Sequence, residues 1–238
     1  GEQRDARYRD SDGSAFAPRD RMLGGHLAAE YTLADGQSAY LTLSRGYKAG
    51  GFNLGPLVPE GRRLFDPEFL RSAELGWRLR RADGRLAFDA ALFYMRRSDQ
   101  QVSTSAQYDP GDPLSFIYIT DNAARGENRG AELTASWRPR ERLRLGASVG
   151  ALRSRYIGYQ LGGRVLDGRD QAHAPRWQYS LTAEYRRARG PYARADLQLV
   201  DAFYFSESHD QRSRPYQLLN LRAGWAAERW DASVWVRN

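Results

Sequence analysis

Few residues in this chain are of a type and spacing that could carry out chemistry. The histidines are His26, His173 and His209, and none stands at a metal-ligand spacing from another. The chain has no cysteine, which excludes thiolate metal sites and disulfides. A hydrolase would need one committed cluster of Ser, His and Asp, for which His26 and His209 are the only starting points. We therefore expect no enzyme, cofactor or metal site, and keep a hydrolase only as a third class of function.

Tyrosine and arginine side chains in two long polar segments are better candidates for a binding site. The segments cover residues 102–128 and 203–216 and mix Tyr, Phe, Arg and Ser. Such groups can stack on a planar chelate or a sugar and form hydrogen bonds to it. The same composition is typical of any solvated loop. We therefore favour the two segments as a whole as the binding site, rather than any single residue within them. The candidates within them are Tyr108, Tyr118, Arg125, Tyr204 and Arg212.

The glycine-rich stretch "SRGYKAGGFN" at residues 44–53 raises the possibility of a phosphate-binding loop. Such a loop needs a helix after it, with its N-terminus at the phosphate. The following sequence, "LGPLVPEGRRLFDPE", contains three prolines and no helical period. We therefore expect these glycines to mark the end of a strand, where the chain bends into a long loop.

An alternation of apolar and polar residues with a period of two dominates the chain and predicts β-strands. Near residue 180 one face carries Trp177, Tyr179, Leu181, Ala183 and Tyr185, and the other carries Arg176, Gln178, Ser180, Thr182 and Glu184. Tight-turn sequences lie at 34–37, 82–85, 138–141, 188–191 and 226–229, and longer polar connections at 51–66, 99–122, 157–174 and 206–215. The pattern predicts about ten strands of roughly 10–14 residues, joined alternately by short and long connections.

The length and composition of these strands favour a membrane barrel. Strands of soluble β-sandwiches are nearer 5–6 residues, whereas about ten tilted residues cross a bilayer. One face carries mainly Leu, Ala, Val and aromatic residues, which suits contact with lipid, and the charged opposite face suits a wet lumen. No charge-free run approaches the ~18 residues of a membrane-spanning helix. The sequence therefore predicts an all-β fold, an antiparallel up-and-down transmembrane β-barrel.

Tryptophans mark the ends of the predicted strands. Trp77, Trp137, Trp225 and Trp230 lie close to short turns, and Trp177 lies close to a long connection. Two aromatic belts at the membrane interfaces are typical of outer-membrane barrels. The alternative is a set of ordinary aromatic residues at the edge of a soluble sandwich.

The charged residues predicted to face inward allow two interpretations. They could form a hydrated, ion-paired lining, or a charged path for an anionic solute. The net charge of +7 would favour anionic solutes. Arginines and acids are interspersed without a long basic block, so nucleic acid is not an expected partner. The set is Glu74, Arg78, Arg80, Asp89, Glu132, Arg138, Arg144, Glu184, Arg194, Asp196, Arg222 and Asp231.

Five motifs, in sequence order, resemble the barrel domain of TonB-dependent outer-membrane receptors. They are "YLTLSRGYKAGGFN", "FDPEFLRSAELGWRLRRADGRLAFDAALFYMRRSDQQV", "NAARGENRGAELTASWRPRERLRLGASVGALRSRY", "HAPRWQYSLTAEY" and "YQLLNLRAGWAAERWDASVWVRN". The resemblance covers about residues 22–238, nearly the whole chain. It implies a barrel of about 22 strands filled by an N-terminal plug. Residues 1–238 would then be a partial β-barrel domain, without the plug, the first strands and the last strand.

The resemblance also implies a function. It implies energised uptake of a scarce solute, most simply a ferric siderophore, across the bacterial outer membrane, with vitamin B12, haem and oligosaccharide as other solutes. The implied partners are a TonB-type energy-coupling complex, acting through the plug, and the outer-membrane lipid. The alternative is a passive porin or a small closed barrel without energy coupling. The strands at about 22–33 and 229–238 would each need a further neighbour, because lipid does not tolerate an unpaired strand edge.

Overall fold

The computed structural model is built around one antiparallel sheet of ten strands. It describes residues 1–9, 13, 15–55, 57–107, 109, 111–112, 114–161, 164–207 and 209–238. The sheet contains β5 (Gly25–Ala34), β6 (Gln37–Lys48), β9 (Glu68–Arg80), β10 (Leu86–Gln107), β11 (Phe116–Arg140), β12 (Leu143–Ile157), β15 (Trp177–Arg186), β16 (Gly190–Val200), β17 (Tyr216–Ala226) and β18 (Asp231–Val236). The sheet strands pair in the order in which they follow one another along the chain, with β5 and β18 at the two edges, which confirms the predicted up-and-down order.

Four small two-stranded ribbons lie outside this sheet. They are β1 (Glu2–Asp5) with β4 (Arg19–Met22), β2 (Tyr8–Arg9) with β3 (Ala15–Phe16), β7 (Gly51–Phe52) with β8 (Leu64–Phe65), and β13 (Gln160–Leu161) with β14 (Arg164–Val165). One 3-10 turn, η1, covers Glu60–Arg62. No helix in the described part of the chain is long and apolar enough to cross a membrane.

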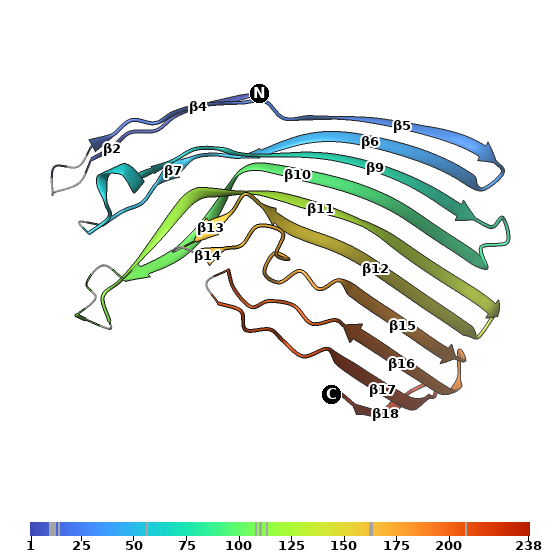
Figure 1. The fold of residues 1–238 in the computed structure, drawn as a ribbon. Coiled ribbons are helices and arrows are strands. Elements are labelled where there is room, and N and C mark those ends of the chain that lie inside the picture. The colour runs from blue at the N-terminus through green and yellow to red at the C-terminus, as the bar shows by residue number, and fades with distance from the viewer. Residues whose placement is uncertain are drawn as a thin grey trace.

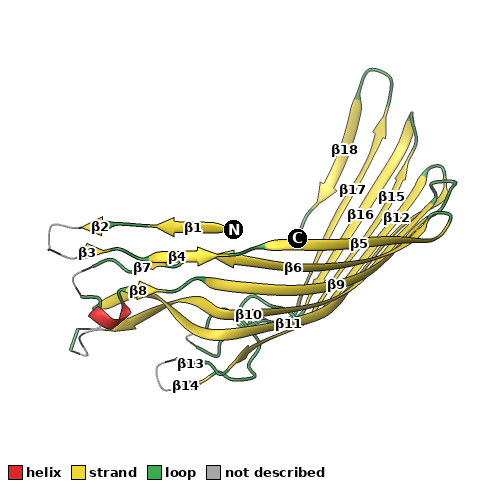
Figure 2. Ribbon diagram, turned by 90° about the horizontal axis from the view of Figure 1, so that it is seen from above, coloured by secondary structure: helices red, strands yellow, loops and turns green. Residues whose placement is uncertain are grey.

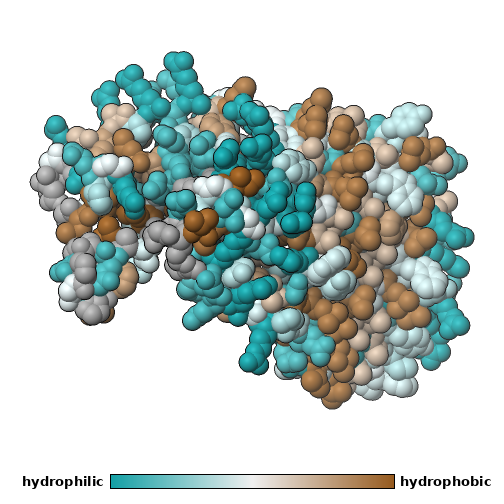
Figure 3. All heavy atoms as spheres, viewed as in Figure 1, coloured by the Kyte–Doolittle hydropathy of each residue, from teal (hydrophilic) through white to brown (hydrophobic). Residues whose placement is uncertain are grey.

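The sheet is curved into an open trough, with β5 at one edge and β18 at the other (Figures 1 and 2). The short connections lie together at one end of the strands and the long ones at the other (Figure 1). Figure 3 shows the convex face, where apolar residues gather towards the short-turn end and polar residues border them on the long-loop side. Both sheet edges are unpaired in the described residues, as expected for the end strands.

The register confirms that one face of the strands is apolar. One cross-strand row contains Ala135, Ala147, Leu181, Leu197 and Leu219 from five adjacent strands. Leu181 is 45% exposed, so this row is no packed interior. The buried apolar cluster lies instead at the long-loop end, where it contains Val102, Tyr156, Tyr159 and Leu166. The sheet therefore presents its Leu and Ala residues outward, as a lipid-facing wall does.

Glycines on the opposite, concave face make room for aromatic rings on the neighbouring strand. Tyr40 lies directly opposite Gly76, and Tyr192 directly opposite Gly224. A Cβ atom at Gly224 would stand 2.6 Å from the Tyr192 ring, and one at Gly76 would overlap the Tyr40 ring. Glycine thus allows a large ring to lie flat across the sheet where any other residue would push it away.

The predicted long connection at 99–122 is wrong in extent, because most of it is strand. β10 continues to Gln107 and β11 begins at Phe116, so the two strands form a ribbon beyond the sheet. A register shift between Arg97 and Gln101 bends the ribbon, with Asp99 at a φ of 54°. The Ser, Asp and Gly residues indicated a loop, but Val, Ile, Phe, Tyr and Thr among them favour strand.

Two glycines of residues 44–53, Gly50 and Gly51, are explained by close approach of another segment, whereas nothing lies within 4 Å of a Cβ atom added at Gly46. Gly51 pairs with Phe65, and a Cβ atom there would stand 2.6 Å from the Phe65 ring. Asn53 then ties this segment to β11, since its side-chain amide donates to the Thr120 carbonyl and accepts from the Thr120 N–H. The stretch continues into the β7–β8 ribbon. No helix directly follows it, as the sequence predicts.

Candidate functional site

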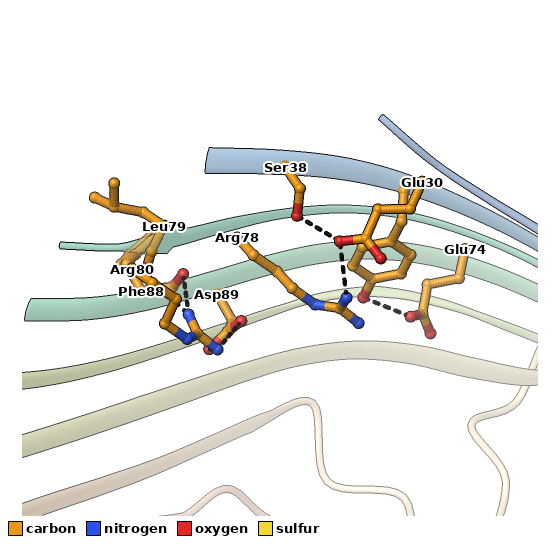
Figure 4. Close-up of polar contacts among 9 residues, drawn as sticks. Glu30, Ser38, Glu74, Arg78, Leu79, Arg80, Phe88 and Asp89 are labelled. Atoms are coloured by element: carbon orange, nitrogen blue, oxygen red, sulfur yellow. Dashed lines mark hydrogen bonds and ion pairs between the residues drawn. The ribbon is translucent and has the colours of Figure 1, made fainter. Parts of the chain in front are cut away.

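The concave face of the sheet carries a network of charged and phenolic side chains. Glu30 accepts a hydrogen bond of 2.6 Å from the Ser38 hydroxyl and lies 3.4 Å from the Arg78 guanidinium (Figure 4). The same guanidinium lies 4.2 Å from the centre of the Tyr40 ring, whose hydroxyl donates to Glu74 at 2.8 Å. The network therefore joins β5, β6 and β9 across the concave face.

A second group of contacts is built from bidentate ion pairs. Arg80 donates to both carboxylate oxygens of Asp89 at 2.7 and 2.8 Å (Figure 4). Farther along the sheet, Arg194 donates to both oxygens of Asp196 at 2.8 and 2.7 Å and lies 3.3 Å from Glu184. These pairs are partly exposed, so each stabilises the fold by no more than about 1 kcal/mol. Much of the inward charge is thus engaged within the wall, which agrees with an ion-paired, hydrated lining.

The long-loop end holds a tyrosine between two guanidinium groups. The Arg169 guanidinium carbon lies 3.9 Å from the centre of the Tyr204 ring, and that of Arg212 lies 4.8 Å from the same centre. Tyr204 also forms β-bridges with Ala172 and with Arg212, which bring the two loop segments together. The result is a compact cationic and aromatic cluster, Arg169–Tyr204–Arg212, on the rim of the trough. Such a cluster suits an anionic or aromatic ligand.

Hydrogen bonds to backbone carbonyls hold Arg169 in this position. Its guanidinium donates to the carbonyls of Ser206, Glu207 and His209 at 2.9, 3.1 and 2.7 Å. The Arg169 side chain is only 10% exposed, so these bonds fix the loop around a largely buried charge. Arg169 therefore acts as the anchor of the loop that carries Tyr204.

Two buried tyrosines support the same loop from below. The Tyr156 hydroxyl donates to the Glu207 carboxylate at 2.6 Å, and the Tyr156 and Tyr159 ring centres are 4.9 Å apart. Burial, with the Glu207 charge as a smaller cause, raises the pKa of Tyr159 to about 12. The Tyr159 hydroxyl is buried without a hydrogen-bond partner among the described residues.

The structure brings together only two of the predicted loop residues. Tyr204 and Arg212 meet in the rim cluster, whereas Tyr118 is 80% exposed on the ribbon formed by β10 and β11. Arg125, on β11, pairs with Ile157 of β12, and the register places Arg125 on the convex face, away from the trough. Tyr108 lies outside the described residues.

Arg169 was missed by sequence reasoning. It lies in a connection whose composition resembles any polar loop, and its contact with Tyr204 spans 35 positions along the chain. No spacing rule links the two residues. The one usable signal is that both lie in long connections, which the strand pattern places at the same end of the sheet.

The predicted interface tryptophans lie at or near strand ends. Trp77 and Trp137 lie close to the short turns after β9 and β11, and Trp225 and Trp230 flank the turn between β17 and β18. Trp177 begins β15 at the opposite end and stacks on Tyr179, with ring centres 5.9 Å apart. Trp137, Trp177, Trp225 and Trp230 are exposed, and Trp77 is half-buried against Phe88.

The described residues contain no group of three or more His, Asp or Glu side chains that could hold a metal ion. His26 lies opposite Ser44 on the concave face, and the His173 ring lies 5.7 Å from that of Phe203. Residues Gly146, Ser148 and Gly150 have the spacing of a hydrolase nucleophile motif, which sequence reasoning overlooked. They lie inside β12, whereas that motif requires a sharp turn from strand to helix.

Comparison with known proteins agrees with this architecture. The family model described as "TonB dependent receptor-like, beta-barrel" matches residues 3–238. The pesticin receptor of Yersinia pestis is 27% identical over 223 residues, which is 92% of this chain and 31% of the receptor. The pesticin receptor of Yersinia enterocolitica has the same identity and coverage.

Similar solved structures contain the same curved antiparallel sheet. The ferric yersiniabactin uptake receptor from Yersinia pestis superposes with a TM-score of 0.76 and 27% identity, covering 95% of this chain and 33% of the receptor. The ferric-catecholate import receptor from E. coli K12 superposes with a TM-score of 0.71 over 95% of this chain and 31% of its own. At 13% identity, that second likeness shows the fold alone. The chain spans about a third of the length of the proteins it matches.

Proposed function

The chain belongs to the TonB-dependent receptor-like β-barrel family, and from this premise we propose that its protein takes up a ferric siderophore by TonB-dependent transport. Members of this family lie in the outer membrane of Gram-negative bacteria, and the chain is part of such an outer-membrane barrel. The family and the similar solved structures are transport receptors rather than enzymes.

The observation that carries the proposal is the likeness to the ferric yersiniabactin uptake receptor. It extends over 95% of this chain, at 27% identity and a TM-score of 0.76. The pesticin receptor of Yersinia pestis is similar to the same extent, over 92% of the chain. A likeness of this extent supports a shared barrel sheet and a shared transport function. The loops that select the solute are expected to differ between the proteins.

We propose that the complete protein is a larger barrel with a plug in its lumen, and that this chain forms about ten of its strands. The open trough with unpaired edges at β5 and β18 supports this, because lipid does not tolerate free edges. A barrel of about 22 strands has room for a plug in its lumen. The plug would contact the charged concave face and would transmit energy from the TonB-type complex.

We place the first contact with the solute at the rim cluster Arg169–Tyr204–Arg212. The Arg212 side chain is exposed and lies over the Tyr204 ring, so a planar anionic chelate could displace solvent there without moving Arg169. Iron in such a chelate is the cargo, and the chelating oxygens would carry the charge that the guanidinium recognises.

An uptake assay with radioactive iron tests the proposal. A strain without its own siderophore receptors would be complemented with the complete protein and offered ⁵⁵Fe bound to a phenolate, catecholate or hydroxamate siderophore. We expect one class to support uptake, and we expect that uptake to vanish when TonB is deleted. Uptake that persists without TonB would instead identify a passive porin, and uptake of none of the three classes would refute the siderophore assignment.

A further inference from the structure

A hollow with a surplus of arginine lies at the short-turn end of the sheet. Its volume is about 260 Å³, and it is lined by the turn between β11 and β12 and the turn between β15 and β16. The side chains around it carry four positive and two negative charges. We call it the arginine hollow, and its charged lining residues are Arg142, Arg144, Arg186, Arg187, Glu141 and Glu184.

The register places the arginine hollow on the concave face of the sheet. Arg144 stands opposite Glu184, and the next residue, Leu145, belongs to the apolar convex face. The Arg186 N–H donates to the Arg142 carbonyl at 2.9 Å, which brings the two turns side by side. The short turns of outer-membrane barrels face the periplasm. The arginine hollow therefore lies at the periplasmic mouth of the lumen.

Neighbouring carboxylates leave most of the positive charge in this hollow uncompensated. None of its four arginines forms an ion pair with a described residue. Glu184 lies 3.3 Å from Arg194, which is outside the hollow, and Glu141 is the other acid of the lining. Arg186 lies 4.8 Å from the centre of the Tyr192 ring. The hollow thus keeps a net positive charge, and the ligand that suits it is an anion.

A second, polar hollow lies farther up the same strands, β12 and β15. Its volume is about 380 Å³, and its polar lining residues are Glu132, Thr134, Ser148, Gln178, Ser180 and Gln198. Between the two hollows, Gly146 stands opposite Thr182. The rim cluster Arg169–Tyr204–Arg212 lies on the loops that follow β12 and β16, at the long-loop end of this part of the sheet. A cationic rim, a polar hollow and the arginine hollow therefore follow one another from the long loops to the short turns.

We propose that the arginine hollow is an exit site, where an anionic solute is held in the lumen before it leaves for the periplasm. The solute class is a compound with several negatively charged oxygens, such as an iron chelate with carboxylate or phenolate groups, because guanidinium groups recognise such oxygens. Exposed arginines bind an anion weakly, which suits release rather than capture. The inference rests on the proposed uptake of a ferric siderophore and adds a lumenal contact to the rim cluster.

The first test measures the charge of the hollow without any solute. Ala188 is exposed and lines the hollow, so Ala188→Cys in a complete receptor free of other cysteines places one thiol there. Its modification rate is compared for a negatively charged sulfonate reagent and a positively charged ammonium reagent of the same thiol chemistry. We expect the negative reagent to react about tenfold faster, and Arg142→Gln/Arg144→Gln to remove this advantage. Equal rates for the two reagents without those substitutions would overturn the site.

The second test asks whether the solute uses the hollow. It compares the complete native receptor with Arg142→Gln/Arg144→Gln and with the control Arg85→Gln/Arg229→Gln, which removes two exposed arginines at other short turns. The probes are ⁵⁵Fe complexes of phenolate, catecholate and hydroxamate siderophores. For the complex that is taken up, we expect the hollow variant to keep the native surface affinity and KM while its maximal uptake rate falls at least about threefold. The control should behave as the native receptor.

Three results of the second test would overturn the exit site. The first is an equal maximal rate in the hollow and control variants. The second is a weaker surface affinity of the hollow variant at an unchanged maximal rate, because this would place the arginines in capture. The third is uptake by the hollow variant without TonB, because this would show that the arginines hold the plug in place.

Two further measurements keep the outcome decisive. If the double variant does not reach the outer membrane, Arg142→Gln alone should lower the maximal rate by about twofold, and an unchanged rate would overturn the site. If the native receptor takes up none of the three complexes, the proposed function fails. The thiol modification rates then still show whether the hollow attracts anions, so the two failures are distinguishable.

Discussion

At the scale of single residues, the two arginines of the rim cluster, Arg169 and Arg212, differ in how far they are buried. Arg169 is largely buried and held by three carbonyls, whereas Arg212 is exposed and lies 4.8 Å from the centre of the Tyr204 ring. The first should therefore be structural, and the second should be available to a ligand. Substitutions at the two positions should have different consequences.

Arg212→Ala should weaken binding of the proposed ferric siderophore by about tenfold, because it removes the exposed cation of the cluster. Titration of the chelate against intrinsic tryptophan fluorescence would measure the affinity. Arg214→Ala is the matched control, since Arg214 is also exposed and stands two residues away. An equal loss in both variants would mean that general positive charge, and not the cluster, attracts the chelate.

Arg169→Met should release the segment around residues 203–212, because three carbonyls lose their donor. Hydrogen exchange followed by mass spectrometry should show faster exchange there, while amides of β15 and β16 keep their protection. If exchange in the segment is unchanged, Arg169 is not its anchor.

At the scale of elements, the strands follow from the alternation of side chains. The period of two around Leu181 predicts both the strand and its outward face, and the register with Leu197 and Ala147 confirms it. The ribbon beyond residue 99 could not be predicted as securely, because its Ser and Asp residues suit loops and strands alike. The contact of Arg169 with Tyr204 depends on how two loops fold over the rim, which no local pattern encodes.

The glycines opposite aromatic rings give a prediction for the sheet itself. Gly130 faces Phe93, and a Cβ atom there would overlap the Ala151 carbonyl oxygen and stand 2.6 Å from the Phe93 ring. Gly130→Ala should therefore destabilise the barrel by about 1–3 kcal/mol, measured from urea unfolding in detergent micelles. Gly150→Ala on the neighbouring strand is the control, since nothing lies within 4 Å of its added methyl group. Equal stability of the two variants would show that the ring opposite Gly130 moves aside freely.

At the scale of the whole molecule, the described sheet is a wall segment with two free edges. Residues 1–238 expressed alone should not form a stable membrane barrel, because β5 and β18 would expose unpaired N–H and C=O groups to lipid. The complete receptor should show a heat-dependent shift on gel electrophoresis, and the segment alone should not. A heat-dependent shift of the segment alone would mean that it closes on itself.

Charge is divided between the two faces of this wall according to what each face meets. The concave face pairs several of its arginines with neighbouring carboxylates, as in the Arg80–Asp89 and Arg194–Asp196 pairs. On the convex face, the register sets Leu and Ala residues of adjacent strands in rows, as with Ala147, Leu181 and Leu197. The convex face thus suits lipid and the concave face suits water.

Site-directed spin labelling tests that division most directly. Because the chain has no cysteine, single cysteines can be placed at Leu181 and Leu197 on the convex face and at Ser180 and Gln198 on the concave face. In the complete receptor in lipid bilayers, labels at the first two positions should collide with lipid-dissolved oxygen, and labels at the other two with a water-soluble nickel chelate. Labels at Leu181 and Leu197 that meet the nickel chelate instead, or neither reagent, would contradict the orientation of the wall.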